Sequence, residues 1–265
     1  MKILFTKMHG AGNDFIVINQ LNKKYNLTKK EIKLLSNRHL GIGFDQLLIV
    51  EKTTLPDAEF KYRIFNADGN EVEQCGNGAR CFYQFVKNKN LSKNSKITVE
   101  TKSGLIVLSE QAENLISVDM GKPIFKDKIS DLFTSVSIGN PHAVIEPLDK
   151  DQKWDDAIKI GLEIQANKTY FPDGVNVSFM KIIDANNLEL KVLERGSGLT
   201  LACGSGACAA AATAILRKLV VSPVTVHMDG GLLIIEWDSL NSIFMSGPAE
   251  IVFEGEFDLS LIKEK

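Results

Sequence analysis

Short runs of apolar residues, some alternating with polar ones, recur along the chain and are typical of β-strands. They predict strands at Lys2–Phe5, Phe15–Ile18, Asp45–Glu51, Phe60–Phe65, Ile97–Thr101 and Leu105–Ser109, of which Asp45–Glu51 is strongly apolar and Phe60–Phe65 alternates. Residues that favour turns separate neighbouring strands, as in Gly10–Asp14 and Lys102–Gly104. The pattern therefore indicates a fold built mainly from short strands joined by tight turns.

Three segments have helical spacing instead. Thr28 and Glu31 form a capping-box pattern, which predicts a helix from there to about His39. A second predicted helix, Ala79–Asn88, has a broad apolar face. A third, Ala207–Leu219, is apolar on nearly every side, and such a helix is usually buried. We therefore expect the third helix, including Leu216, to lie at the centre of its sheet.

The order of the first half returns in the second half. Cys203 lies 128 residues after Cys75, and Asn140 lies 127 residues after Asn13. The stretches around Val224–Val226 repeat those around Ile97–Val99 at a similar spacing. The chain is therefore predicted to contain two copies of one α/β unit.

The expected fold class is α/β (α+β), with two pseudo-symmetric domains. Each domain is expected to be a curled, mostly antiparallel sheet around a central helix, with the active site in the cleft between the domains. The expected domains are residues 1–120 and 121–249, each with one of the two repeated cysteines. Glu250–Phe257 has no counterpart in the first half. We place it as a closing strand, and a return of residues 250–265 to the first domain is one option.

The composition argues against several classes of protein, including nucleic-acid-binding and membrane proteins. The chain has 265 residues, 44% of them hydrophobic, and a net charge of -2, which argues against a nucleic-acid or membrane surface. No apolar run approaches the roughly 18 residues of a membrane span, and the apolar run at the N-terminus is too short for a signal peptide. The four cysteines have neither Cys-x-x-Cys nor zinc-finger spacing. We interpret them as reduced, which predicts a cytoplasmic protein.

Two of the cysteines stand at the start of predicted helices. Cys75 begins the sequence Cys-Gly-Asn-Gly-Ala, and Cys203 begins Cys-Gly-Ser-Gly-Ala. A helix N-terminus offers backbone N–H groups and the positive end of the dipole, and both favour the thiolate. The glycines also let the backbone approach a bound anion such as a carboxylate. By contrast, Cys81 and Cys208 lie within apolar helix faces and are interpreted as buried hydrophobic residues.

A pair of such thiols has a specific chemical use. Inversion at a carbon requires a base on one face and an acid on the other, and two thiols related by a repeat can supply both. The negative charge that develops would be held by backbone N–H groups that also grip the substrate carboxylate, those of Gly76, Asn77, Gly204 and Ser205. This chemistry needs no cofactor and no metal.

Six motifs, in order over nearly the whole chain, resemble those of the diaminopimelate epimerases: Met8–Phe15, Phe65–Gly69, Cys75–Cys81, Gly139–His142, Glu194–Gly196 and Ala202–Cys208. The resemblance implies a pyridoxal-independent isomerase that interconverts LL- and meso-2,6-diaminopimelate on the bacterial lysine and cell-wall route. It also implies two similar domains with the active site between them.

The resemblance further implies roles for individual residues. Cys75 and Cys203 match the acid/base pair, and His142 and Glu194 match residues that tune the two thiols. The implied substrate contacts are Asn13, Gln46, Asn66, Asn140, Asn176, Glu194 and Arg195. The planar fork of Arg195 suits a carboxylate. One departure is Leu199, where many members of the family have Glu.

Other functions remain open at this stage. A relative of the proline racemases is the nearest alternative, although such proteins usually have His where this chain has Asn77. A thiol redox protein would need a nearby resolving cysteine, and an anion-binding module would leave the paired thiols unexplained. The expected partners are the small-molecule substrate and a second copy of the chain in a homodimer, with neither nucleic acid nor membrane.

Overall fold

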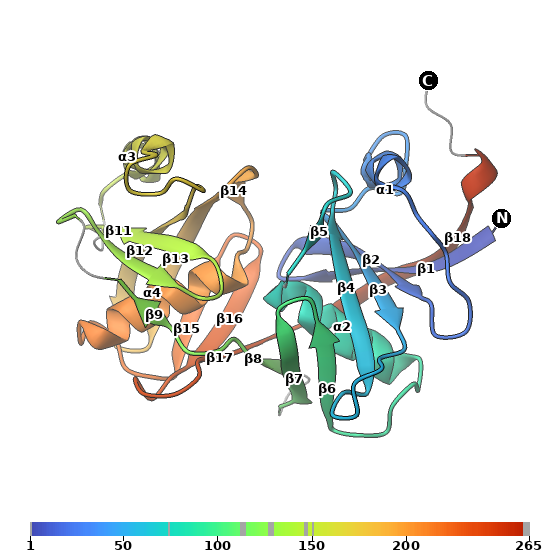
Figure 1. The fold of residues 1–265 in the computed structure, drawn as a ribbon. Helices are drawn as coiled ribbons and strands as arrows, with labels where there is room; N and C mark the ends of the chain where they lie inside the picture. Colours follow the sequence, from blue (N-terminus) through green and yellow to red (C-terminus); the bar gives the residue numbers. More distant parts are fainter. Residues whose placement is uncertain are drawn as a thin grey trace. The chain divides into compact units, whose positions relative to one another are not determined.

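The computed structural model describes residues 2–73, 75–111, 115–126, 130–145, 148–149 and 151–261. The chain forms two compact units (Figure 1): unit 1 comprises Met1–Val118 and Pro248–Lys265, and unit 2 comprises Asp119–Gly247. In the described residues many short strands accompany four α-helices. The fold is therefore of the mixed α/β class that the hydrophobic pattern predicted.

Unit 1 contains two helices and most of the strands of the first half. The helices are α1 (Lys29–Ser36) and α2 (Gly76–Asn88). The strands are β1 (Lys2–Gly10), β2 (Asn13–Asn19), β3 (Gln46–Glu51), β4 (Phe60–Asn66), β5 (Glu71–Val72), β6 (Lys96–Thr101), β7 (Gly104–Glu110), β8 (Ile116–Asp119) and β18 (Glu250–Asp258), with a short 3-10 helix at Leu259–Leu261. Strand β18 pairs antiparallel with β1, so the end of the chain completes the sheet formed by its beginning.

Unit 2 has the same kinds of element. Its helices are α3 (Trp154–Ala166) and α4 (Gly204–Leu216). Its strands are β9 (Ile124–Phe125), β10 (Phe133–Ser137), β11 (Pro141–Ile145), β12 (Asn176–Asp184), β13 (Asn187–Glu194), β14 (Gly198–Thr200), β15 (Val224–Met228), β16 (Gly231–Glu236) and β17 (Phe244–Gly247).

The two units share one topology. In unit 1, β1–β2, β3–β4 and β6–β7 are antiparallel, whereas β2–β3 and β4–β6 are parallel. In unit 2, β10–β11, β12–β13 and β15–β16 are antiparallel, and β11–β12 and β13–β15 are parallel. Helices α1 and α3 occupy the first parallel crossover, and α2 and α4 the second. The repeat predicted from the cysteine spacing is therefore a repeat of structure.

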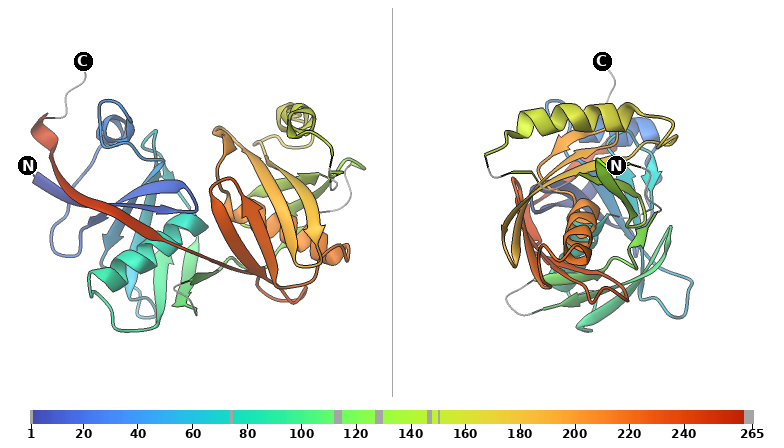
Figure 2. Two further views of the ribbon diagram at one scale, coloured as in Figure 1. Left: turned by 180° about the vertical axis from the view of Figure 1, so that it is seen from behind. Right: turned by 90° about the vertical axis from the view of Figure 1, so that its left-hand side faces the viewer.

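In each unit the second helix lies against the sheet. The right-hand view of Figure 2 shows strands of unit 2 around α4, which packs against β10, β11, β12, β13, β15, β16 and β17. Helix α4 begins at Gly204 and ends at Leu216, three residues before the predicted span at each end. Residues Ala207–Ala214 are buried, as predicted, but the side chain of Leu216 is 47% exposed, so its predicted burial is wrong. The helix emerges from the sheet over its last turn.

The end of α1 also differs from the prediction, for a local reason. Helix α1 has the predicted capping box at Thr28 and Glu31 but ends at Ser36 rather than near His39. Asn37 is extended there, and its side-chain oxygen accepts hydrogen bonds from the backbone N–H groups of His39 and Leu40. Such an Asx turn competes with helix and ends it.

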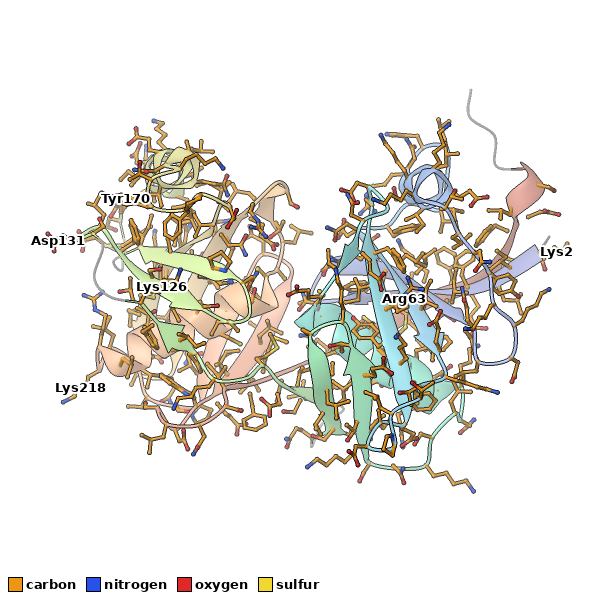
Figure 3. All side chains as sticks on the ribbon, in the orientation of Figure 1. Lys2, Arg63, Lys126, Asp131, Tyr170 and Lys218 are labelled. Carbon is orange, nitrogen blue, oxygen red and sulfur yellow. The ribbon has the colours of Figure 1, made fainter. Side chains whose placement is uncertain are left out.

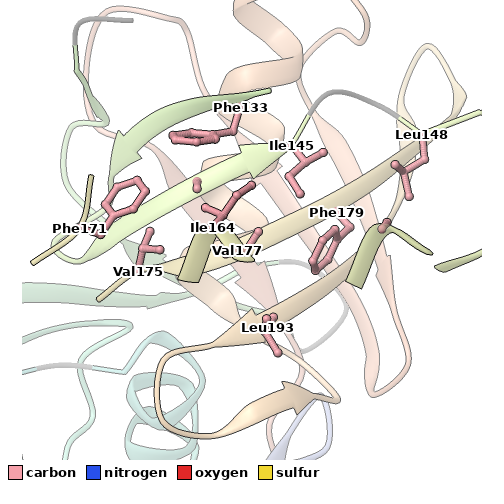
Figure 4. Packing of buried hydrophobic residues seen from close by; sticks show 11 residues of the cluster. Phe133, Ile145, Leu148, Ile164, Phe171, Val175, Val177, Phe179 and Leu193 are labelled. Carbon is pink, nitrogen blue, oxygen red and sulfur yellow. The ribbon is translucent and has the colours of Figure 1, made fainter. Parts of the chain in front are cut away.

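The core of unit 2 lies between α3 and the sheet. Figure 4 shows the cluster, in which Phe179 of β12 packs with Leu148 and Ile164, and Phe133 packs with Phe171. A side chain at Gly161 of α3 would collide with the Phe179 ring, because an added Cβ would lie 2.3 Å from its Cζ atom. The glycine therefore lets α3 pack closely on β12.

Unit 1 has a corresponding core under α1, formed by Ile3, Ile16, Ile32, Leu35 and Leu47 with their neighbours. The side chain of Lys2, labelled in Figure 3, lies at the exposed edge of this unit. Arg63 of β4, labelled in that figure, makes two hydrogen bonds of 2.8 and 2.9 Å to the carboxylate of Glu71 in β5. This bidentate ion pair ties β5 to β4 a few residues before Cys75.

Candidate active site

The first thiol is the N-cap of α2. Cys75 has an extended backbone, its carbonyl accepts from the N–H of Ala79, and its side chain is half-buried. Its Sγ atom lies 3.7 Å from Oδ1 of Asn13, which also accepts a 3.4 Å hydrogen bond from Nδ2 of Asn77. Three residues predicted for the site therefore meet in one place.

The sheet of unit 1 aligns the other predicted residues at the same edge. Asn13 is the first residue of β2, Gln46 is the first of β3 and Asn66 is the last of β4. Gln46 is the register partner of Asn66, and its Nε2 donates a 2.8 Å hydrogen bond to Oδ1 of Asn66. The parallel and antiparallel pairings thus bring together amides that are far apart in the sequence.

The glycines of the first turn allow α2 to approach the sheet. An added Cβ at Gly78 would lie 2.5 Å from the Tyr62 hydroxyl, and one at Gly10 would lie 3.2 Å from the carbonyl of Asn77. A side chain at Gly78 would therefore displace Tyr62, and one at Gly10 would press on the start of α2. The close packing places the N-terminus of α2, with Gly76 and Asn77, beside the β1–β2 turn that carries Asn13.

The second thiol occupies the equivalent position in unit 2. Cys203 is the N-cap of α4, and its side chain is 5% exposed, so it is more deeply buried than Cys75. Its Sγ atom lies 3.7 Å from the hydroxyl oxygen of Ser205. A Cβ added at Gly206 would lie 3.3 Å from that sulfur, so the helix backbone also faces the thiol.

The protonation state of Cys203 differs from the expectation based on its helix position. Burial and the negative charge of Glu194 raise the pKa of the Cys203 thiol well above its usual value. Hydrogen bonds from the Gly206 backbone and from Ser205 act in the opposite direction but are weaker. The predicted thiolate character of Cys203 is therefore wrong for this structure, in which the protonated thiol is the favoured form.

His142 connects the second thiol to a predicted substrate contact. Its Nε2 lies 3.0 Å from Oδ1 of Asn140 and 3.0 Å from the hydroxyl of Ser205. Because an amide oxygen can only accept, Nε2 carries the proton. His142 is fully buried, and desolvation lowers its pKa to about 3, so the ring is neutral at physiological pH.

The remaining predicted residues of unit 2 lie on adjoining strands. Asn176 is the register partner of His142, and its Oδ1 accepts a 2.8 Å hydrogen bond from the backbone N–H of Arg195. The guanidinium of Arg195 donates to the carbonyl of Asp173 at 2.5 Å. The arginine is thereby fixed at both its backbone and its side chain.

Sequence reasoning did not identify three residues that contact this set. Thr200 donates a 2.6 Å hydrogen bond to the Glu194 carboxylate, and Asp45 accepts one of 2.9 Å from Asn13. Tyr62 is fully buried beneath the first turn of α2, where burial and the nearby thiols Cys75 and Cys81 raise its pKa. Asp45 directly precedes Gln46 and Thr200 lies near Cys203, so proximity to the motifs was the available signal.

The other two cysteines are separate from these clusters. Cys81 and Cys208 are completely buried within α2 and α4, which confirms their interpretation as core residues. Burial raises the pKa of Cys81 strongly. Across the part of the chain that the structure describes, no three or more His, Cys, Asp or Glu side chains are grouped so as to hold a metal ion. None of the described helices has the length and apolar character to cross a membrane.

The family model and the curated relatives that match this chain carry the same description. The family model described as diaminopimelate epimerase matches residues 5–126 and 134–252. The diaminopimelate epimerase of Aromatoleum aromaticum is 46% identical over 279 residues, covering 98% of this chain and 100% of the relative. That of Cupriavidus metallidurans is 44% identical, covering 99% of both chains.

Solved structures of lower identity share the fold. A hydroxyproline epimerase from Agrobacterium vitis has a TM-score of 0.71 at 11% identity, covering 96% of this chain and 92% of that one. A phenazine biosynthesis protein of the PhzF family from Bacillus anthracis has a TM-score of 0.69 at 15% identity, covering 97% and 99%. Given the family match and the identities of the close relatives over almost their full length, the chain belongs to the diaminopimelate epimerase family.

Proposed function

We propose that this protein interconverts LL- and meso-2,6-diaminopimelate by proton transfer between two cysteines, as a step of bacterial lysine and cell-wall precursor synthesis. The observation that carries the proposal is the repeated placement of a thiol as the N-cap of a buried helix, with polar side chains around it. Full-length similarity to diaminopimelate epimerases supports the substrate. No cofactor is needed for the chemistry.

In this mechanism one thiolate removes the α-proton, and the other thiol gives its proton to the opposite face of the same carbon. The C–H bond electrons pass into an enolate-like carboxylate and then form the new C–H bond. Cys203 suits the role of acid in the resting protein, because burial and Glu194 favour its protonated form. The product leaves the two sulfurs with their protonation states exchanged, so reaction in either direction is possible.

The helix starts would hold the charge that develops. The first N–H groups of a helix have no partner within it, and they point along the axis towards the N-cap. In α2 these groups belong to Gly76 and Asn77, and in α4 to Gly204 and Ser205. Two such helix ends would bind the reacting carboxylate and stabilise the enolate without any metal ion.

The distal end of the substrate carries an ammonium and a second carboxylate. Each of these groups needs polar residues of matching charge or hydrogen-bonding capacity. Arg195 is an exposed cation whose position is fixed through Asp173 and Asn176, so it suits the carboxylate. The side chains of Asn13, Gln46, Asn66 and Asn140 would complete the binding. Glu194 would bind an ammonium group of the substrate and would also raise the pKa of Cys203.

The direct test is exchange of the α-proton of LL-diaminopimelate in deuterated water, followed by NMR and chiral separation of the isomers. Cys75→Ala and Cys203→Ala should each lower kcat by at least a thousandfold, because each removes one of two obligatory proton-transfer groups. Cys81→Ala is the matched control, since this buried thiol lies on the same helix as Cys75 and should leave kcat within a few-fold.

Either single variant with near-normal turnover would contradict the two-thiol mechanism. The same assay with proline and hydroxyproline addresses the racemase alternative. Rapid inversion of these amino acids, without inversion of diaminopimelate, would assign the protein to that activity instead.

We also propose that the protein is a cytoplasmic homodimer. Leu4 of β1 and Val252 and Phe253 of β18 are exposed apolar side chains on neighbouring strands. A second copy of the chain would remove them from water. Light scattering coupled to size-exclusion chromatography should give about twice the chain mass of 29.3 kDa. A monomer at micromolar concentration would contradict the dimer without affecting the assigned reaction.

A further inference from the structure

The side-chain amide of Asn13 has two different neighbours at its two ends. Its Oδ1 faces the Cys75 sulfur at 3.7 Å and accepts from Asn77. Its Nδ2 donates a 2.9 Å hydrogen bond to Oδ2 of Asp45. The orientation of this one amide therefore decides whether the thiol meets a hydrogen-bond acceptor or a donor.

Asp45 is itself held from several sides. Its Oδ2 accepts a second hydrogen bond, from the backbone N–H of Asp14 at 3.2 Å, and its Oδ1 accepts one from Arg38 at 2.8 Å. Its own backbone N–H donates to the carbonyl and to Oδ1 of Asp14 at 3.0 and 2.9 Å. Asp45 directly precedes Gln46, the first residue of β3, which pairs in parallel with Phe15 of β2.

Asp14 anchors this arrangement. It makes ion pairs with Arg38 at 2.7 Å and with Lys7, whose side chain is largely buried. Hydrogen bonds from Arg38 and Lys7 lower the pKa of the Asp14 carboxyl despite its partial burial. The carboxylate of Asp45, which is 44% exposed, is thus joined through Arg38 to the Asp14 ion pairs.

An ionised carboxylate can only accept hydrogen bonds. The Asn13 amide must therefore present its NH2 group to Asp45 and its oxygen to Cys75. The reverse orientation would place the amide oxygen against a carboxylate and would separate it from the Asn77 donor. An oxygen acceptor stabilises the S–H form of the thiol and so makes its thiolate a stronger base, whereas an NH2 donor would stabilise the thiolate and weaken it as a base.

We propose that Asp45 is a positioning residue that fixes the orientation of the Asn13 amide and thereby controls the protonation state of Cys75. The importance of this control for catalysis rests on the proposed function, but its effect on the thiol does not. The described residues of unit 2 contain no equivalent pair of aspartate and asparagine beside the thiol. There Val175 occupies the position before Asn176, and Asn140 is held by His142 instead. The two thiols are therefore set by different groups.

Other charged or titratable groups also face this region. Lys7 comes from β1, Asp14 from β2 and Arg38 from the segment after α1; Lys7 and Arg38 pair with Asp14, and Arg38 also pairs with Asp45. Tyr62 of β4 and Cys81 of α2 interact electrostatically with Cys75 directly. Arg80 of α2 is buried beside Cys81. These groups are unchanged in the variants chosen below.

The test uses protein labelled with 13C at the cysteine β-carbon, whose chemical shift reports thiol and thiolate for each cysteine without any substrate. Asp45→Asn keeps the size of the side chain but adds an NH2 donor, so the Asn13 amide is free to reverse. We expect the titration midpoint of Cys75 to fall by about half a pH unit or more. Asp45→Glu retains a carboxylate and should move the titration midpoint of Cys75 much less. The midpoint of Cys203 should stay unchanged in both variants and is the internal control.

A second background separates the amide orientation from the charge of Asp45. If Asp45 acts through Asn13, then Asp45→Asn should have no further effect on Cys75 in an Asn13→Ala protein. An equal shift in both backgrounds would mean a direct charge effect and would overturn the proposal, as would an unchanged midpoint in Asp45→Asn. Thermal melts of each variant verify folding, and if Asp45→Asn unfolds, Asp45→Ser in the two backgrounds gives the same comparison. Because no turnover is measured, either result leaves the cysteine-to-alanine test of the reaction independent.

Discussion

At the scale of single residues, the two repeated cysteines show how much the surroundings of a thiol matter. Both cap a helix, yet Cys75 is half-buried beside an amide, whereas Cys203 is buried beside a carboxylate. The helix N-terminus favours a thiolate by at most about 2 kcal/mol. Burial and a neighbouring negative charge can exceed that, and at Cys203 they do.

The first prediction concerns Glu194. Glu194→Gln removes the negative charge beside Cys203 while keeping the side-chain shape, so the pKa of Cys203 should fall. The 13Cβ titration of Cys203 should therefore move to lower pH, with that of Cys208 on the same helix unchanged. If the Cys203 midpoint stays where it is in the wild type, Glu194 has no role in tuning this thiol.

The second prediction concerns His142 and acid stability. The folded protein holds His142 neutral down to about pH 3, whereas the unfolded chain binds a proton there below about pH 6.5. Protonation thus favours the unfolded state, and stability falls as pH drops through this window. Between pH 7 and 5 the loss from this group should be about 2 kcal/mol.

His142→Gln removes this titration. Urea unfolding at pH 7 and 5 should show a smaller loss of stability on acidification in His142→Gln than in the wild type, by about 2 kcal/mol. His39→Gln, at an exposed position, is the control and should lose as much as the wild type. Equal losses in the wild type and His142→Gln would mean that His142 is protonated in the folded state.

At the scale of elements, α4 combines a buried body with an exposed end. Its alanines are small enough for strands to surround the helix closely, and Ala209–Ala212 are completely buried. Its last residue, Leu216, emerges from the sheet, and Lys218 follows in a left-handed conformation with φ 59. An apolar sequence continues past the point where burial ends, so hydrophobicity alone placed the boundary too late.

The third prediction compares one substitution at two positions of α4. Ala211→Asp places an unpaired charge at a fully buried site and should cost several kcal/mol, enough to prevent folding. Leu216→Asp affects a half-exposed side chain and should cost about 1 kcal/mol or less. Chemical denaturation of both variants makes the comparison. Severe destabilisation by Leu216→Asp would indicate that its exposed surface is covered by another chain.

At the scale of the whole molecule, the two copies of the fold differ in how the chain completes them. Unit 2 is one continuous stretch, Asp119–Gly247, with its own core. Unit 1 requires both chain ends, because β18 pairs with β1 through eight residue pairs and Pro248 accepts a hydrogen bond from the buried Arg80. This pairing joins residues from opposite ends of the sequence, such as Lys2 and Asp258.

The fourth prediction follows from this difference in continuity. A fragment of residues 119–247 should fold alone and give a dispersed amide NMR spectrum, whereas residues 1–118 alone should not fold stably. Adding residues 248–265 to the first fragment through a Gly/Ser linker should restore a cooperative melt. A stable fold of 1–118 without β18 would show that the closing strand is dispensable.

The sequence by itself determined the features that depend on neighbouring residues or on periodicity. Short apolar or alternating runs identified the strands, Thr28 and Glu31 marked the start of α1, and the 128-residue spacing of Cys75 and Cys203 indicated the repeat. These signals are local because strand pleat, helix caps and turns are set by residues close in the chain. The six motifs, in order along nearly the whole chain, were likewise sufficient to indicate the family.

Only the tertiary structure decided the properties that depend on residues brought together from distant segments. The raised pKa of Cys203 requires burial and Glu194, the exposure of Leu216 depends on where the surrounding strands end, and the fixed amide of Asn13 requires Asp45 from the next strand. None of these follows from a local pattern, because burial, charge proximity and hydrogen-bond direction are set by packing between elements. The elements and their order could thus be predicted, but the protonation chemistry of the thiols could not.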